Sequence, residues 1–234
     1  MKLLKNFLKK TNRNDRYYWE YYNRLHFISS AIKKLNLPPS AKILDVGGAT
    51  GDNLLAKFEI PNVTTLDISA DADMVASADN IPAADNSYDI VTCIDTLEHI
   101  PSEKRERVIH ELIRAASRAV FIAAPVDSAE NNKAERLVLK YVKNKFIEEH
   151  QKYGLVDFEK IKSLLREKKN SGLIESFEIG ELDDLLNWVI MMTAGYVDGN
   201  AIYQEAYFLE NKFHPRRCAI SIYKTAPTQA ILTE

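Results

Sequence analysis

Glycine and cysteine are both scarce in this chain, and their positions are informative. Only eight of the 234 residues are glycine, and three of them (Gly47, Gly48, Gly51) fall within five positions. The two cysteines, Cys93 and Cys218, are too far apart to indicate a disulfide framework or zinc-ligand spacing. Both lie in apolar, strand-like runs, which predicts that they are small buried hydrophobic residues.

Other absences narrow the class of protein. The chain has no apolar run of 18 residues, so no transmembrane span is predicted, and its first residues lack the apolar core of a signal peptide. A net charge of −2 argues against a broad nucleic-acid-binding face, so no nucleic-acid partner is expected. A chain of this length can bury roughly 70% of its unfolded surface in one domain. We therefore expect a cytoplasmic globular enzyme.

The one local charge imbalance is at the N-terminus. Residues 1–16 carry six basic side chains, with Leu3, Leu4, Phe7 and Leu8 at helical spacing. Such a helix either contacts an anionic membrane surface weakly or packs on the protein with its basic face in solvent. We predict a helical N-terminal segment over residues 1–40 and a main domain over residues 41–234.

Residues 43–51 read Ile-Leu-Asp-Val-Gly-Gly-Ala-Thr-Gly, a short apolar strand that breaks into a turn of small residues. Glycine permits positive φ and lets a ligand lie directly against the backbone. A strand, such a turn and then helical sequence are typical of a nucleotide-binding corner. The spacing is not the G-x-G-x-x-G of dinucleotide sites, and Asp45 at the strand end suits a cation better than a pyrophosphate. S-adenosylmethionine (SAM), which carries a sulfonium and an ammonium, fits this corner better than NAD.

Four segments in order resemble the motifs of class I SAM-dependent methyltransferases: residues 43–54, 63–67, 76–82 and 88–101. One departure is Ala49, where that family has the middle glycine of G-x-G-x-G. The resemblance implies a set of cofactor contacts along these segments. The methionine end of SAM would contact Asp45, Gly47 and Gly51, with Gly48 and Ala49 between them. The Ile94 backbone would contact the amino-acid moiety. The residues in contact with the adenosine would be Asp67, Ile68, Asp79 and Asn80.

Apolar runs and intervening helical segments predict the fold. Strands are expected near residues 42–46, 62–67, 74–78, 88–94, 119–124, 172–180 and 216–224. This alternation predicts an α/β, Rossmann-like, seven-stranded and mostly parallel sheet with helices on both faces. The family resemblance implies that the last strand is antiparallel.

Two helical insertions interrupt the alternation, at about residues 127–170 and 182–213. We expect them to form a lid over the carboxyl edge of the sheet, where insertions often determine specificity. The aromatic and methionine residues of the second insertion would either line an acceptor pocket or form the core of the lid.

Methyl transfer from SAM requires mainly that the acceptor be aligned with the methyl group. A base is needed only where the acceptor must lose a proton. His99, in the loop after the fourth predicted strand, and His150, in the first insertion, are the candidate catalytic residues. Each of them also has a structural or surface role as its alternative.

Asp95, Glu98 and His99 have i, i+3, i+4 spacing, which would place them on one helical face and able to hold a divalent metal. The segment around them is similar to that of the ubiquinone-biosynthesis O-methyltransferases, in which a comparable run has been associated with metal binding. The Leu-Glu-His-Ile sequence is also widespread in metal-free class I methyltransferases, where it fixes the loop. We predict no metal and keep these three residues as the candidates.

The sequence therefore predicts a SAM-dependent methyltransferase that acts on an oxygen or nitrogen of a small-molecule acceptor. Two other interpretations remain open at this point. One is a non-catalytic member of the fold that binds SAM or a partner protein. The other is an NAD-dependent or nucleotide-sugar enzyme.

Overall fold

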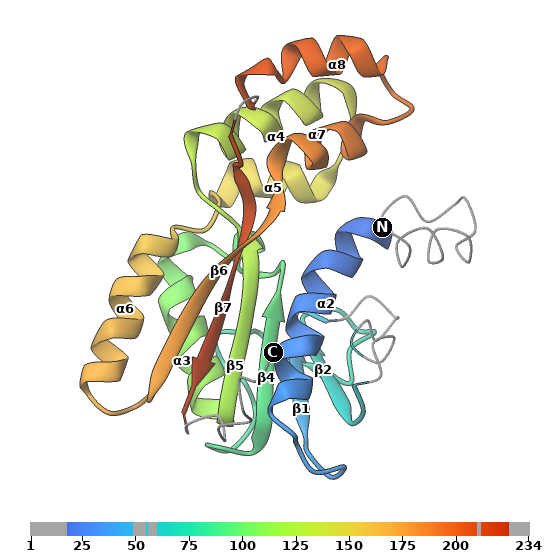
Figure 1. The fold of residues 1–234 in the computed structure, drawn as a ribbon. Helices are drawn as coiled ribbons and strands as arrows, with labels where there is room; N and C mark the ends of the chain where they lie inside the picture. The colour runs from blue at the N-terminus through green and yellow to red at the C-terminus, as the bar shows by residue number, and fades with distance from the viewer. Residues whose placement is uncertain (1–17, 49–54, 56–59, 210–211, 225–234) are drawn as a thin grey trace.

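The protein forms one mixed sheet with helices on both faces (Figure 1). The computed structural model describes residues 18–48, 55, 60–209 and 212–224. Within these ranges, seven strands pair in the order β3-β2-β1-β4-β5-β7-β6. Their bounds are β1 Ile43–Val46, β2 Val63–Asp67, β3 Met74–Val75, β4 Tyr88–Ile94, β5 Ala116–Pro125, β6 Ser176–Asp184 and β7 Pro215–Tyr223. β7 runs antiparallel to both β5 and β6, and the other pairs of neighbouring strands are parallel. The predicted fold, including its antiparallel last strand, is confirmed.

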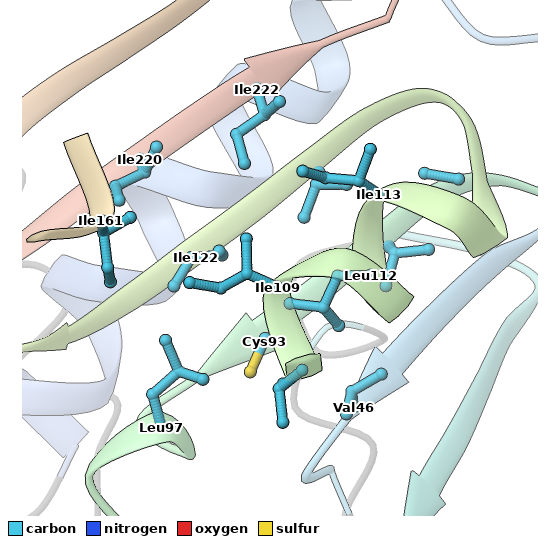
Figure 2. Close-up of a cluster of buried hydrophobic side chains, with 14 of the residues drawn as sticks. Val46, Cys93, Leu97, Ile109, Leu112, Ile113, Ile122, Ile161, Ile220 and Ile222 are labelled. Carbon is cyan, nitrogen blue, oxygen red and sulfur yellow. The ribbon is translucent and has the colours of Figure 1, made fainter. Parts of the chain in front are cut away.

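Helices cover both faces of the sheet because its central strands are apolar on both sides. α2 (Tyr18–Lys34) packs Leu25, Ile28 and Ile32 against one face. α3 (Arg105–Ala115) and α6 (Phe158–Asn170) cover the other. Figure 2 shows Ile109, Leu112 and Ile113 of α3 above Cys93 and Ile122 of the sheet. Cys93 and Cys218 are both free thiols and both buried, as the sequence predicts.

Local backbone turns set the bounds of two elements. The chain forms a 3-10 turn over Ser102–Lys104 before α3 begins, and α3 ends at Ala115 because the chain becomes extended at Ala116 and enters β5 directly. The strand expected from residue 172 begins only at Ser176. Gly172, at φ +77°, donates its N–H to the Lys169 carbonyl and ends α6, which is a common role of a glycine in the left-handed region.

The remaining helices form a separate layer, the helical cap, beyond the carboxyl ends of the parallel strands (Figure 1). It comprises α4 (Ala129–Tyr141), α5 (Lys145–Tyr153), α7 (Leu185–Thr193), α8 (Gly199–Glu205) and the 3-10 turn Tyr207–Leu209. Ala134, Val138, Trp188, Val189 and Ile202 are buried together in its core. The two stretches that interrupt the strand pattern therefore pack on each other, whereas α6, which lies within the first stretch, packs on the sheet.

Polar side chains fix where the cap helices begin. Ser128, Asn144, Asp184 and Asp198 each accept a hydrogen bond from a backbone N–H in the first turn of α4, α5, α7 and α8, respectively. Such N-caps satisfy amides that the helix itself leaves without partners. The Asn144 cap sets the residue at which α5 begins, and therefore which α5 side chains face the turn Leu97–His99 at the end of β4.

Candidate active site

A cavity of about 830 Å³ lies between the carboxyl edge of the sheet and the helical cap. Its walls come from the ends of β1, β2 and β4, the 3-10 turn η2 (Leu97–His99), α5, α7 and the start of β7. Most residues singled out in the sequence line it. They are Asp45, Gly47, Gly48, Asp67, Ile68, Asp79, Ile94, Asp95, Glu98, His99 and His150.

Three of the predicted cofactor contacts are not among the lining residues. Asn80 is described but does not line the cavity. Its N–H instead donates to the Ser77 carbonyl and closes a turn. Ala49 and Gly51 lie outside the described residues.

Asp45 is a buried carboxylate at the end of β1, where it accepts a hydrogen bond from the Thr92 hydroxyl at 2.6 Å. Burial raises its pKa to about 6, Thr92 opposes this rise, and the nearby Asp67 adds to it. A buried carboxylate is costly to ionise unless a cation lies beside it. The ammonium or sulfonium of SAM is a cation of the required kind.

The two glycines after β1 leave room that a side chain would remove. Gly47 has φ +85°, and a Cβ there would lie 2.1 Å from the Thr96 Oγ1 atom. A Cβ at Gly48 would lie 2.5 Å from an oxygen of Asp45. The Gly47 N–H donates to the Leu66 carbonyl at 2.7 Å, which ties the turn to β2. The bare backbone therefore forms one wall of the cavity, as expected for close approach of a ligand.

The residues predicted to contact adenosine lie in the loops after β2 and β3. Asp67 accepts the Ser69 N–H at 2.9 Å, and the next side chain, Ile68, is 81% exposed. Asp79 accepts from the Ser77 hydroxyl and lies 3.3 Å from the Lys104 ammonium. These two contacts, the hydroxyl first, hold the pKa of Asp79 below its usual value. Asp79 is therefore a charged acceptor at the rim of the cavity.

Two histidines of the cavity wall lie against each other, one from the turn η2 that follows β4 and one from the cap. His99 ends η2 and His150 lies on α5, with their ring centroids 4.8 Å apart. The Nδ1 atom of His99 lies 2.8 Å from a carboxylate oxygen of Glu149, and that of His150 lies 2.7 Å from one of Glu135. Burial and the neighbouring His150 lower the pKa of His99, and Glu149 partly opposes this. The fold thus brings together the two histidines that the sequence singled out separately.

A buried network holds Glu135 in place behind His150. Arg216, at the start of β7, donates to Glu135 at 2.8 Å and to Asn131 at 3.0 Å. Its guanidinium lies 3.9 Å from the centre of the Trp188 ring. Burial alone would raise the pKa of Glu135, but the bond to His150 and the charge of Arg216 lower it. Glu135 is therefore an anion that orients His150.

Asp95 does not join Glu98 and His99, the other two residues that the sequence offered as candidate metal ligands. Both of its carboxylate oxygens accept from the Arg217 guanidinium, at 2.9 and 3.1 Å, and Arg217 also reaches Asp183. Asp95 has φ +47° and precedes η2, so the i, i+3, i+4 spacing does not place the three residues on one helical face. The potential ligands that do come together are Glu98, His99 and His150.

Sequence reasoning missed Glu135, Arg216 and Arg217. The two arginines carry a signal that could have revealed them. Because the last strand is antiparallel, its first residues lie at the carboxyl edge of the other strands, beside the cavity. Two consecutive arginines there point to opposite faces of the strand, so that Arg216 pairs with Glu135 and Arg217 pairs with Asp95 and Asp183.

Comparison with known proteins agrees with this geometry. A family model described as "Methyltransferase domain" matches residues 18–166, more than half of the chain. The chain belongs to this methyltransferase family. Its cofactor is S-adenosylmethionine, and the buried Asp45, the two glycines and the adjoining cavity fit such a ligand. The family match favours a methyltransferase over an NAD-dependent or nucleotide-sugar enzyme.

Solved structures similar to this methyltransferase share its fold at low identity. A putative methyltransferase from Bacillus halodurans is 14% identical, with a TM-score of 0.53 over 84% of this chain and 97% of that one. A SAM-dependent methyltransferase from Archaeoglobus fulgidus is 16% identical, with a TM-score of 0.53 over 90% and 100%. Magnesium protoporphyrin IX methyltransferase from Synechocystis, with bound S-adenosylhomocysteine (SAH), is 13% identical, with a TM-score of 0.53 over 86% and 82%. No curated protein sequence matches the chain.

The sequence of this methyltransferase predicts no membrane-spanning helix. Among the described residues, each helix is too short or too polar to cross a bilayer. The basic segment at residues 1–16 lies outside the described residues.

Proposed function

We propose that this methyltransferase transfers the methyl group of SAM to an oxygen or nitrogen atom of a small molecule bound beneath the helical cap. The observation that carries the proposal is the single cavity that joins the cofactor residues to the cap. Its volume is in the usual range for small-ligand sites. Phe146 of α5 and Trp188 and Met192 of α7 give the cap side an apolar and aromatic wall.

The sequence offered two roles for the aromatic and methionine residues of the second insertion, as the wall of an acceptor pocket or as the core of the lid. The structure gives different residues different positions. Trp188 is buried in the core of the cap and also lines the cavity, and Met192 lines it as well. Tyr196, Tyr203 and Tyr207 are exposed large side chains that do not line the cavity. We infer that the acceptor contacts α7 rather than α8.

The cofactor side of the cavity supplies recognition. Asp45 would face the ammonium end of SAM, the bare backbone at Gly47 and Gly48 would allow close approach, and Asp67 would bind the ribose through its two carboxylate oxygens. Bound SAM supplies a methyl group that is already activated by the positive sulfur. The protein therefore has to align the acceptor with the methyl group and exclude water.

His99 and His150 would act on the acceptor side. Each ring is held at Nδ1 by a carboxylate, which leaves Nε2 as the nitrogen available to an acceptor proton. A histidine that is oriented in this way by a carboxylate is a suitable general base. The pair would be needed for acceptors that must lose a proton, such as hydroxyl groups.

The proposal is tested by measuring SAH formation from SAM with sets of phenols, catechols, aliphatic alcohols and amines. We expect turnover with one of these classes, and we expect His99→Ala and His150→Ala to lower kcat by about 10²–10⁴-fold. Thermal stabilisation by SAH should persist in both variants, because neither histidine is assigned to cofactor binding. His110→Ala, at an exposed histidine of α3, is the matched control and should keep full activity.

Two results would contradict the proposal. Unchanged turnover in both active-site histidine variants would remove their catalytic role. Methylation of a protein or nucleic acid, with no reaction on any small acceptor, would show that the acceptor class is wrong while leaving the methyltransferase activity intact.

A further inference from the structure

We propose that Glu98, His99 and His150 form a binding site for one divalent first-row transition-metal ion, which links the sheet to the helical cap. One donor atom from each residue lies within 4.8 Å of the other two. Glu98 and His99 belong to η2, at the end of β4, and His150 belongs to α5 of the cap. The site is therefore made by two parts of the chain that meet only in the folded protein.

The hydrogen bonds around the two histidines are those of metal-binding histidines. A ligating histidine commonly donates its other ring N–H to a carboxylate, which fixes the tautomer and the ring direction. Here Glu149 holds the Nδ1 of His99 and Glu135 holds the Nδ1 of His150. Both arrangements leave Nε2 as the coordinating nitrogen, and both rings lie at the same cluster.

His150 supplies an independent observation. The residue is only 6% exposed, and its Nε2 is buried with no hydrogen-bond partner among the described residues. A buried polar nitrogen without a partner destabilises the folded protein, because it has lost its hydrogen bonds to water. A purely structural ion pair with Glu135 accounts for Nδ1 but leaves Nε2 unexplained. A metal ion beside Glu98 and His99 would satisfy it.

The donor set indicates the kind of ion. Two imidazoles and one carboxylate are the ligands of catalytic zinc sites and of open first-row sites. Magnesium and calcium prefer sets made of oxygen alone. In a tetrahedral site, metal–ligand bonds of about 2.0–2.2 Å place the donor atoms about 3.3–3.6 Å apart. The donor atoms here lie within 4.8 Å of one another, so the three side chains would need to draw together by roughly 1 Å. The ion would keep open positions toward the cavity.

The consequence for catalysis rests on the proposed function, with one change. In the metal-bound protein the Nε2 atoms of His99 and His150 hold the ion and do not accept the proton of the acceptor. An ion at this point would bind the oxygen of a hydroxyl acceptor and lower the pKa of that hydroxyl. The hydroxyl proton would leave to solvent, the oxygen would form a bond to the methyl carbon, and the carbon–sulfur bond would break with its electron pair staying on sulfur. The products are a methyl ether, SAH and one proton. The site thus favours an oxygen acceptor over a nitrogen acceptor.

Direct binding of Co²⁺ tests the site without any acceptor. The full chain, freed of metal with EDTA and dialysed, is titrated with Co²⁺ and followed by its visible absorption bands and by calorimetry. We expect one ion per chain and a rise in Tm, because the ion joins the cap to the sheet. Absence of specific binding by the folded wild-type chain overturns the proposal.

Variants identify the ligands. His150→Gln and Glu98→Gln should abolish tight binding. Glu149→Gln removes the partner of His99 from a partly exposed position and should weaken binding about 10–100-fold. The neighbouring exposed Glu148→Gln is its matched control and should bind normally. Because Glu149→Gln does not disturb the core, it keeps the test decisive if His150→Gln fails to fold.

Asp95→Asn separates this site from a site made by the loop alone. The proposal expects Asp95→Asn to retain Co²⁺ and His150→Gln to lose it. The opposite pattern, or equal binding by wild type and His150→Gln, overturns the proposal. Thermal stabilisation by SAH is measured in parallel. Stabilisation by SAH without Co²⁺ binding refutes the metal site alone, whereas Co²⁺ binding without any response to SAH refutes the cofactor assignment alone.

Discussion

At the scale of single residues, Asp45 shows how a binding site is built at the cost of stability. Its carboxylate is buried at the end of β1 with the Thr92 hydroxyl as its neutral partner. Without a cofactor, burial holds its pKa at about 6. The ionised form is therefore less favoured in the free protein than it would be in water, and we expect the positive charge of the cofactor to favour it.

This predicts a pH dependence of cofactor affinity. SAH, which retains the ammonium group, should bind with constant affinity above about pH 7. Its affinity should fall by up to tenfold per pH unit below about pH 6, because Asp45 must then lose a proton on binding. Calorimetry between pH 5 and pH 8 measures this. Asp45→Asn should bind at least tenfold more weakly at pH 7 and should lack the Asp45 titration step.

The contribution of Asp45 to the stability of the ligand-free protein should decrease as pH rises, whereas the affinity for SAH should increase. The pKa of Asp45 is raised in the folded state from an ordinary value of 3.8, so between about pH 4 and pH 6 the folded state binds more protons than the unfolded state. The contribution of Asp45 to the free energy of unfolding therefore decreases as pH rises through this window, by on the order of 2–3 kcal/mol. Chemical denaturation of wild type and Asp45→Asn at pH 7 should show the variant to be the more stable. Equal stability would contradict the predicted cost of the buried charge.

Gly47 makes a second residue-scale prediction. Alanine at this position would face both a left-handed backbone and a Cβ placed 2.1 Å from the Thr96 hydroxyl oxygen. We expect Gly47→Ala to lower the free energy of unfolding by about 2–4 kcal/mol and to abolish stabilisation by SAH. Gly199→Ala is the matched control, since no atom lies within 4 Å of the added Cβ. It should change stability by less than about 1 kcal/mol.

At the scale of elements, Arg105 fixes α5 relative to the sheet. This buried arginine of α3 donates to the Ile100 carbonyl at 2.9 Å, and to the carbonyls of Leu155 at 2.7 Å and Tyr153 at 3.0 Å. One guanidinium thus ties the chain just after η2 to the C-terminal end of α5. His99 and His150 lie on the two elements that it joins.

We predict that Arg105→Met destabilises the protein by about 2–4 kcal/mol, because several carbonyl groups lose a charged donor. The value is measured by chemical denaturation. If Arg105 also positions α5, the variant should raise the KM for the acceptor while the affinity for SAH changes little. The exposed Arg107→Met, two residues later on the same helix, should leave both properties unchanged.

The elements of the sheet could be predicted from sequence far better than the contacts of the cap. Buried strands such as β4 and β5 are mainly apolar runs, and the glycine turn marks the end of β1, so local sequence is sufficient. The pairing of Arg216 with Glu135 joins residues 81 positions apart, and no local pattern predicts such a contact. The grouping of Asp95 with Glu98 failed because the backbone turns left-handed at Asp95, which spacing alone does not reveal.

At the scale of the whole molecule, the site is divided between two layers that form from different parts of the chain. The cofactor wall comes from β1, β2 and β4, all within the matched methyltransferase domain at residues 18–166. The wall that we propose for the acceptor draws on α5 within that span, and on α7 and the start of β7 outside it. The family match therefore covers the chemistry of the cofactor but only part of what selects the acceptor.

The strand order has a consequence for the newly made protein. Within the described residues β6 pairs only with β7, which lies between it and β5 and is the last strand of the chain. While the protein is being synthesised, β1 to β5 can assemble as they emerge, but β6 has no neighbour to join until β7 inserts. Arg216 and Arg217 arrive with that strand. The strands of the cofactor wall can therefore form early in synthesis. The cavity itself is complete only when β7, which carries Arg216 and Arg217, has been made.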